Sequence, residues 1–258
     1  MLTQARLATT PCDGQRVRVI DYEALRAEVL RIQRRYSEEV VEAFGFCPWA
    51  RGARNAGRVC VEVLFGEEPT HAETLAAIAS LIRDDTTDVG LLVLPELTLG
   101  RVDFQHFAAR LRELTAPPAD GLLSAFAIAD FHPQVEPRLE SPERLVAVIR
   151  KSPDPTLQIV RRSTLEAVRH GDRQGTRFVD MNRIGNLDSL PPQPEALHAR
   201  IAQANFDTVE ERGLAVLVGV LADILADRNQ SYVRLGLPLP PWAAESVDQK
   251  QENLAPAE

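Results

Sequence analysis

Apolar residues recur along the chain with two alternating periods. Between Asp21 and Phe44 they return every three or four positions, which predicts an amphipathic helix with Asp21 as its N-cap. Thr70 and Glu73 have the spacing of a capping box and predict the start of a second helix. The same periodicity predicts helices over Thr70–Arg83, Val102–Leu114 and Thr156–Arg169, and one or two helices between Glu195 and Gln230, with Gly213 and Gly219 as weak points.

Continuous apolar or β-branched runs separate these helices and predict strands. They cover Arg58–Phe65, Val89–Leu94 and Leu122–Phe131, and a short edge strand is predicted over Thr176–Met181. Strands that alternate with helices indicate an α/β fold, with a mixed or mostly parallel sheet flanked by helices and with N- and C-terminal helices. A ferredoxin-like α+β arrangement with an antiparallel sheet would give a similar order of elements and is the alternative.

The same pattern predicts how the 258 residues divide. We expect a flexible leader over 1–18, a single α/β domain over 19–237, and a Pro-rich arm with a disordered acidic tail over 238–258. The most apolar run, Leu214–Ala226, is shorter than the roughly 20 residues of a membrane-spanning helix, and it contains Asp223. No secretory signal precedes the first helix. We therefore expect no membrane association.

Charge and cysteine content narrow the possible partners and location. The 29 Lys and Arg residues are outnumbered by 37 Asp and Glu residues, so a nucleic-acid partner is not expected. Three cysteines are too few for a disulfide framework, which favours a reducing cytoplasm. The sequence contains no Gly-rich phosphate loop, no paired Cys-x-x-Cys and no zinc-binding helix, so no metal site is expected, and whether the protein uses a cofactor is left open.

Cys47 is the first candidate for chemistry. It follows the first predicted helix, and Arg51 and Arg54 could supply the positive charge that a reactive thiolate needs. The alternative is a small buried residue in a turn anchored by Phe46 and Trp49.

Asp130 and His132 form the second candidate, at the carboxyl end of the third predicted strand. Residues two apart on a strand project to the same face, so Asp130 could orient the imidazole of His132 as a general base. The alternative is a strand-end histidine bonded to the backbone, with Pro133 ending the strand.

The third candidate is the segment 150–156, which leads into the predicted helix over Thr156–Arg169. Ser152 is one of its candidate N-caps, and Arg150, Lys151 and Arg161 are cations near the predicted helix start. Free N–H groups at such a start would favour an anionic ligand, whereas ordinary helix capping would need none.

Three stretches in this order resemble motifs of an uncharacterised bacterial family, domain of unknown function 1415. Residues 46–50 are similar to its Leu-Cys-Pro-Phe-Ala stretch, 131–133 to its Phe-His-Pro stretch, and 151–157 to its Arg-Ser-Pro-x-Pro-x-Leu stretch. A fainter likeness at Asn205 and Thr208 adds Asn205 to the residues expected to bind a ligand.

The chain departs from the family pattern at three positions. Gln158 stands where the family has a histidine, Arg162 where it has an acidic residue, and Asp130 is not part of the pattern, so the chain resembles a divergent member. The family brings no known activity. The resemblance implies that Cys47, His132, Ser152 and Arg161 share one neighbourhood.

Two functions fit these observations, and whether the chain is an enzyme stays open. In the first, a small-molecule enzyme uses His132 as general base or acid and Cys47 as nucleophile or pocket wall, with Arg161 and the segment at Ser152 holding an anionic group. In the second, a non-catalytic binding or regulatory module takes an anionic metabolite in the same pocket. Its C-terminal region would then mediate assembly into a homo-oligomer.

Overall fold

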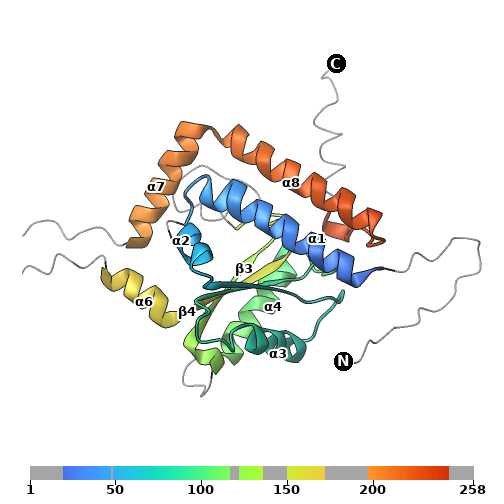
Figure 1. Ribbon diagram of the computed structural model, residues 1–258, viewed down its shortest axis with the longest axis horizontal. Coiled ribbons are helices and arrows are strands. Elements are labelled where there is room, and N and C mark those ends of the chain that lie inside the picture. Colours follow the sequence, from blue (N-terminus) through green and yellow to red (C-terminus); the bar gives the residue numbers. More distant parts are fainter. Residues whose placement is uncertain (1–19, 48, 117–121, 136–149, 172–196, 244–258) are drawn as a thin grey trace, which may run out of the picture.

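Four strands form one mixed sheet at the centre of the protein (Figure 1). The computed structural model describes residues 20–47, 49–116, 122–135, 150–171 and 197–243. The strands are β1 (Val59–Val63), β2 (Val89–Val93), β3 (Phe126–Phe131) and β4 (Thr156–Arg161), in the order β1-β2-β4-β3. β1 and β2 are parallel, whereas β4 is antiparallel to both of its neighbours. This confirms an α/β fold with a mixed sheet, and the parallel pair distinguishes it from the antiparallel ferredoxin-like alternative.

Helices cover both faces of the sheet (Figure 1). On one face, α3 (His71–Leu81) and α4 (Arg101–Leu114) pack on Leu92 and Leu157. On the other, the long helices α1 (Tyr22–Arg35) and α8 (Leu214–Arg234) lie side by side over Val63 and Val93. The remaining helical elements are η1 (Tyr36–Glu42), α2 (Ala50–Asn55), η2 (Leu122–Ala125), α6 (Arg162–Gly171) and α7 (Leu197–Arg212).

The two predicted helix caps are present. The Asp21 carboxylate accepts hydrogen bonds from the backbone N–H groups of Glu23 and Ala24, each at 3.1 Å. Thr70 and Glu73 form a complete capping box at the start of α3. After α1 the helix continues as the π-helix η1, and the chain turns at Gly45 with φ of +67°, a conformation that favours glycine.

The prediction of a helix over Thr156–Arg169 is wrong in its first part. Residues 156–161 form β4, and α6 begins only at Arg162 and ends at Gly171. Leu157 and Ile159 alternate with Gln158 in a period of two, and both lie in the core beneath α3 and α4. Pairing with β2 and β3 on both sides outweighs the helical periodicity, so no helix starts near Ser152.

Several other predictions have partial outcomes. The third predicted strand begins at Phe126, because η2 precedes it. The late helical region is two helices joined at Gly213, which has φ of +88°, whereas Gly219 lies inside α8. The leader over 1–18, the edge strand over Thr176–Met181 and residues 244–258 of the arm and tail lie outside the described residues. The helices that the structure describes include none with the length and apolar character to cross a bilayer.

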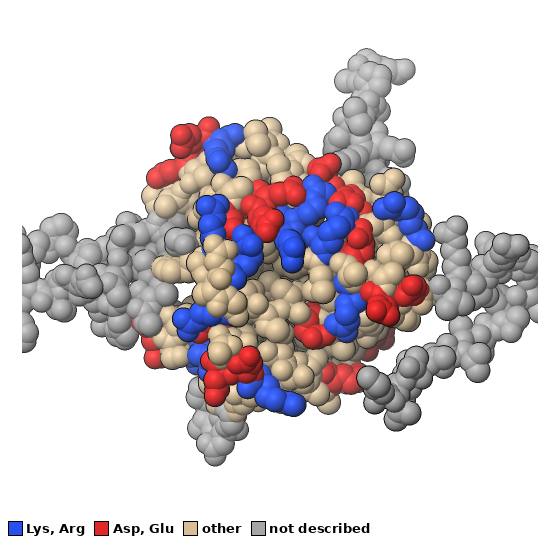
Figure 2. Space-filling view, in the orientation of Figure 1, with Lys and Arg blue, Asp and Glu red and all other residues tan. Residues whose placement is uncertain are grey.

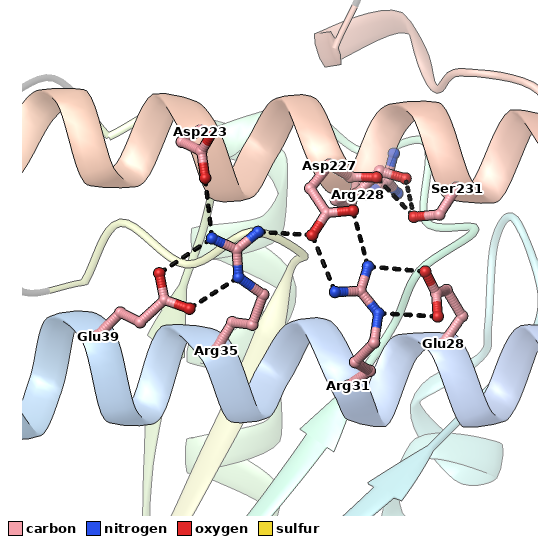
Figure 3. A network of polar contacts seen from close by, with 8 residues as sticks. All are labelled: Glu28, Arg31, Arg35, Glu39, Asp223, Asp227, Arg228 and Ser231. Carbon is pink, nitrogen blue, oxygen red and sulfur yellow. Dashed lines mark hydrogen bonds and ion pairs between the residues drawn. The ribbon is translucent and has the colours of Figure 1, made fainter.

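Ion pairs join α1 to α8 along their outer surface. Figure 2 shows basic and acidic side chains interleaved on this face, and Figure 3 shows Arg31 and Arg35 of α1 reaching toward α8. Arg31 donates to both carboxylate oxygens of Asp227, at 2.9 and 2.7 Å, and Arg35 bridges Asp227 and Asp223 at 2.5 and 2.8 Å. These contacts are partly exposed, so they fix the register of the two helices more than they stabilise the fold.

Candidate functional site

His132 lies directly after β3 in a fully enclosed position. Its side chain is 2% exposed and packs against the rings of Phe104 and Trp242. Nδ1 accepts from the backbone N–H of Gln134 at 3.2 Å, so Nε2 carries the proton and donates to the carbonyl oxygen of Leu99 at 3.1 Å. Burial lowers the pKa of His132 to about 4. The imidazole is therefore neutral near pH 7, with both nitrogens bonded to the backbone.

Asp130 does not orient this imidazole. It faces α4, as the predicted alternation requires, and its carboxylate accepts from Arg112 at 2.9 Å. The hydrogen bonds of His132 go to the backbone instead. Asp130 and His132 thus do not form the expected general-base pair, because the Asp130 carboxylate is bonded to Arg112 of α4.

Cys47 lies in the turn between η1 and α2. Burial raises the pKa of its thiol, and the backbone N–H groups of Trp49 and Ala50 offset this only in part by donating to the sulfur. Asn205 of α7 lies next to this turn, since its Nδ2 donates to the carbonyl oxygen of Phe46 at 3.3 Å. The structure therefore brings Asn205 and the Cys47 turn together.

The two arginines expected to activate Cys47 are paired with a carboxylate. Arg54 Nε donates to Glu42 at 2.7 Å, and Arg51 Nε donates to the same group at 3.3 Å. Glu42 is the last residue of η1, and the two cations lower the pKa of its carboxyl group. Arg54 also pairs with Glu38 at 3.1 Å, so two carboxylates balance the charges of the two guanidinium groups.

The structure does not bring Cys47 and His132 together. Phe46, beside the thiol, belongs to the core cluster beneath α1 and α8, whereas Phe104, beside the imidazole, belongs to the cluster beneath α3 and α4. The sheet separates these two clusters. No hydrogen bond joins the two side chains, both of which lie in the described part of the chain.

The segment 150–152 lies against the turn that carries His132. The carbonyl oxygen of Arg150 accepts from the backbone N–H of His132 at 3.0 Å, while the Arg150 residue itself is exposed. Lys151 Nζ donates to the carbonyl oxygen of Val135 at 2.8 Å. Ser152 is buried and donates through Oγ to the carbonyl oxygen of Asp154 at 2.5 Å. His132, Lys151 and Ser152 therefore do share a neighbourhood.

Arg161 lies at the opposite end of β4. Its guanidinium donates to the carbonyl oxygen of Thr87 at 3.2 and 3.0 Å and lies over the ring of Phe126 at 4.8 Å. Five strand residues at about 3.3 Å each place it roughly 17 Å beyond Thr156. Arg161 does not join Ser152 in an anion site.

Sequence reasoning missed a buried polar network that joins Asp154 to α8. Arg228 is completely buried; its Nε donates to Asp154 Oδ1 at 2.9 Å and its Nη2 to the carbonyl oxygen of Pro95 at 2.8 Å. The Tyr232 hydroxyl donates to the second oxygen of Asp154 at 2.8 Å. One signal was available, because Arg228 continues the apolar stripe that begins at Leu217. A lone arginine on a buried stripe requires a buried acidic partner.

Between α8 and the segment 151–153 the surface carries a shallow depression. Its enclosed part, about 10 Å³, has room for about one water molecule and is far below the roughly 300 Å³ at which sites for drug-sized ligands begin. One wall is polar and proline-rich, and the other is aliphatic. The polar wall consists of Pro133 and Lys151–Pro153, and the aliphatic wall of Leu221, Ile224 and Leu225.

Metal coordination has no candidate in the described ranges, where no three His, Cys, Asp or Glu side chains gather in a way that could hold an ion. Comparison with curated proteins and with solved structures gives no match. A family model described as a protein of unknown function, DUF1415, matches residues 28–183. This range includes Cys47, His132 and Asp154 but ends before Asn205 and Arg228. Since the match spans more than half of the sequence, the chain belongs to the DUF1415 family.

Proposed function

We propose that this protein is a non-catalytic binding module for a small anionic ligand, held in the depression between the segment 151–153 and α8. The observation that carries this proposal is the composition of the two walls. Lys151 supplies a cation on one side, and Leu221, Ile224 and Leu225 supply apolar surface on the other. A small molecule with an acidic group and a short aliphatic part matches both walls. The small cysteine content favours the reducing cytoplasm as its location.

The states of the two candidate catalytic groups support binding over catalysis. A general base works best with a pKa near the working pH, whereas burial holds the pKa of His132 at about 4. A nucleophilic cysteine needs a lowered pKa, whereas burial raises that of Cys47. Both environments are those of structural residues.

Calorimetric titration with acetate, butyrate and hexanoate tests the proposal. We expect affinity to rise with alkyl length, because longer chains cover more of the aliphatic wall. Lys151→Gln should weaken butyrate binding about tenfold or more, and Lys151→Arg should retain it. Arg110→Gln is the matched control, since Arg110 is exposed and pairs with Glu113 on α4.

Two results would overturn the proposal. One is the absence of binding for all three carboxylates to the folded wild-type protein. The other is a Lys151→Gln variant that binds butyrate as tightly as the Arg110→Gln control does.

A further inference from the structure

The strand β1 lies at one edge of the sheet and has an outer side. Within the described ranges it pairs only with β2. The N–H of Leu64 donates to the carbonyl oxygen of Val93, and along a strand the backbone groups of alternate residues point to the same side, so the even-numbered residues of β1 bond to β2. The N–H and C=O groups of Val59, Val61 and Val63 therefore point away from the sheet. Such groups can pair with a strand of another chain.

Both ends of this outer side are closed. The N–H of Val63 donates to the Glu62 carboxylate at 3.3 Å, and its carbonyl oxygen accepts from Arg26 at 3.1 Å. At the other end the chain turns at Gly57, which has φ of +68°. Two outward residues remain between these ends.

These two residues, Val59 and Val61, form an open window in the edge. Both are half-buried, and the Val61 N–H contacts the sulfur of the adjacent Cys60, which is a weak acceptor. No other described residue bonds to the outward groups of the two valines. Figure 1 shows β1, in teal, on the near side of the sheet beneath α1, and Figure 2 shows mostly uncharged surface there.

One antiparallel register with a second copy of the chain uses this window and nothing else. When the pair is centred on Cys60, Val59 of each copy lies opposite Val61 of the other, and four hydrogen bonds form between outward groups. A pair centred on Val61 would need Val63, whose groups are already bonded. A pair centred on Val59 would need the turn at Gly57 to be a strand.

The charges beside the window match in the same register. Arg58 of each copy then lies opposite Glu62 of the other, on the face that also carries Cys60. Within one chain Arg58 already pairs with Asp88, and Glu62 with Arg26. The side chains of Arg58 and Glu62 are nevertheless 52% and 42% exposed, so each can also contact a charge of the second copy. Opposite charges directly across an antiparallel pair stabilise it.

We propose that β1 pairs with β1 of a second copy, antiparallel and centred on Cys60, so that two four-stranded sheets join into one continuous sheet. Leu30, one turn after Arg26 on α1, is 38% exposed and adds apolar contact beside the paired strands. The interface does not include the depression beside α8, so this inference is independent of the proposed function.

Sedimentation equilibrium of the full chain between about 1 and 200 µM tests whether the dimer forms. We expect the mass to rise with concentration toward twice that of one chain. Val61→Pro removes an outward N–H and leaves the bonds to β2 in place, as proline does on an edge strand. It should weaken dimerisation by about tenfold or more, with a thermal midpoint close to that of the wild type.

Charge reversal tests the register without a change in the backbone. Arg58→Glu and Glu62→Arg each place like charges opposite each other in the homodimer, and each should weaken association by about tenfold. An equimolar mixture of the two variants should associate about as tightly as the wild type, because opposite charges again face each other across the pair. Arg110→Glu, on the exposed side of α4, is the matched control and should leave association unchanged.

Cys60 reports the register directly. In the proposed pair the two Cys60 Cα atoms lie about 4.5 Å apart, a separation that a disulfide can bridge, whereas a shifted register would separate them by more than about 7 Å. A Cys12→Ser, Cys47→Ser variant should therefore form a covalent dimer on mild oxidation. The control replaces all three cysteines by serine and carries Arg110→Cys, at a site where the arginine side chain is 58% exposed. It should cross-link more slowly, although its thiol is accessible.

Any of three results would show that β1 is not the interface. The first is a wild type that stays monomeric over the whole concentration range, whichever other strand then fills the edge. The second is a dimer that neither Val61→Pro nor the charge reversals weaken. The third is cross-linking through Cys60 that is no faster than that of the control.

Discussion

Replacing Arg228 by methionine tests what holds α8 on the sheet. The substitution keeps a long apolar side chain but removes the charge that neutralises Asp154. In the native protein, Arg228 Nε donates to Asp154 Oδ1 at 2.9 Å, and Nη2 lies 2.9 Å from the same oxygen as an ion-pair contact. Nη2 also donates to the carbonyl oxygen of Pro95 at 2.8 Å. In the variant, the Asp154 carboxylate keeps only the Tyr232 hydroxyl at 2.8 Å. An ionised carboxylate would thus remain buried with one neutral donor.

The expected loss is large because both partners are enclosed. The side chains of Arg228 and Asp154 are 0% and 1% exposed, so water cannot take over the lost bonds. Breaking a buried pair from one side costs about 3–5 kcal/mol, a sizeable part of a typical total stability of about 5–15 kcal/mol. With a urea slope of about 3 kcal/mol per molar, the unfolding midpoint should fall by more than about 1 M.

Equilibrium urea unfolding measures this loss of stability, and two further variants test its cause. Arg31→Met removes a 43% exposed arginine from the outer network and should cost about 1 kcal/mol or less. The double variant Arg228→Met with Asp154→Asn should be more stable than Arg228→Met alone, because it removes the orphaned charge. A loss below about 1 kcal/mol for Arg228→Met, or a double variant less stable than it, would refute this account of the network.

Three further predictions concern single positions. The pKa of His132 is 6.5 in the unfolded chain and about 4 in the folded protein. The contribution of the neutral imidazole to folding stability is therefore complete above pH 6.5 and is lost as the pH falls toward 4. The wild type should lose about 3 kcal/mol more than His132→Gln over that range, and equal pH profiles in chemical unfolding would contradict this. Gly90→Ala would place its Cβ 2.7 Å from Leu81 Cδ2 and should destabilise the protein by about 1–3 kcal/mol. Gly219→Ala adds a methyl group in open space on α8 and should stabilise the protein by about 0.5–1 kcal/mol. Thermal unfolding that ranks the two variants in reverse would be inconsistent with the packing. In a variant that keeps Cys47 as its only cysteine, iodoacetamide should react slowly at pH 7, because burial raises the pKa of the thiol. The rate should be the same after His132→Gln. Rapid alkylation that slows in His132→Gln would instead support the catalytic hypothesis.

Local signals predicted most of the fold correctly. Asp21 and Thr70 act as the caps that their side chains suggest, because capping depends on residues within one turn. The buried run at Val89–Leu94 became β2, flanked by strands on both sides. These elements are specified by their own residues and need little from the rest of the chain.

The segment after Ser152 shows where such signals fail. Residues 156–161 carry apolar side chains that fit either a strand or the first turns of a helix, and periodicity over six residues does not separate the two. These residues form a strand and not a helix because they pair with both β2 and β3, between which they lie in the sheet. The anion site expected at a helix start depended on this assignment, and it disappeared with the helix.

The neighbourhood expected from the family motifs divides for a related reason. His132 and Ser152 meet because the carbonyl oxygen of Arg150 accepts from the backbone N–H of His132. In contrast, Asn205 donates to Phe46 in the turn that carries Cys47, and Arg161 donates to the carbonyl oxygen of Thr87. Motif order along a chain carries no information about which face of a sheet a residue reaches. Only the strand order and the packing of helices determine that.

The Asp154 network explains why the segment 151–157 has a fixed shape without serving as a helix start. Arg228, which is 74 residues further along the chain, neutralises Asp154, and Tyr232 one turn later completes the contact. Both residues lie outside the range matched by the family model, which ends at 183. The same α8 that fixes Asp154 supplies the aliphatic wall of the depression through Leu221, Ile224 and Leu225. The network and the proposed ligand site are therefore parts of one arrangement, because α8 carries both Arg228 and the aliphatic wall.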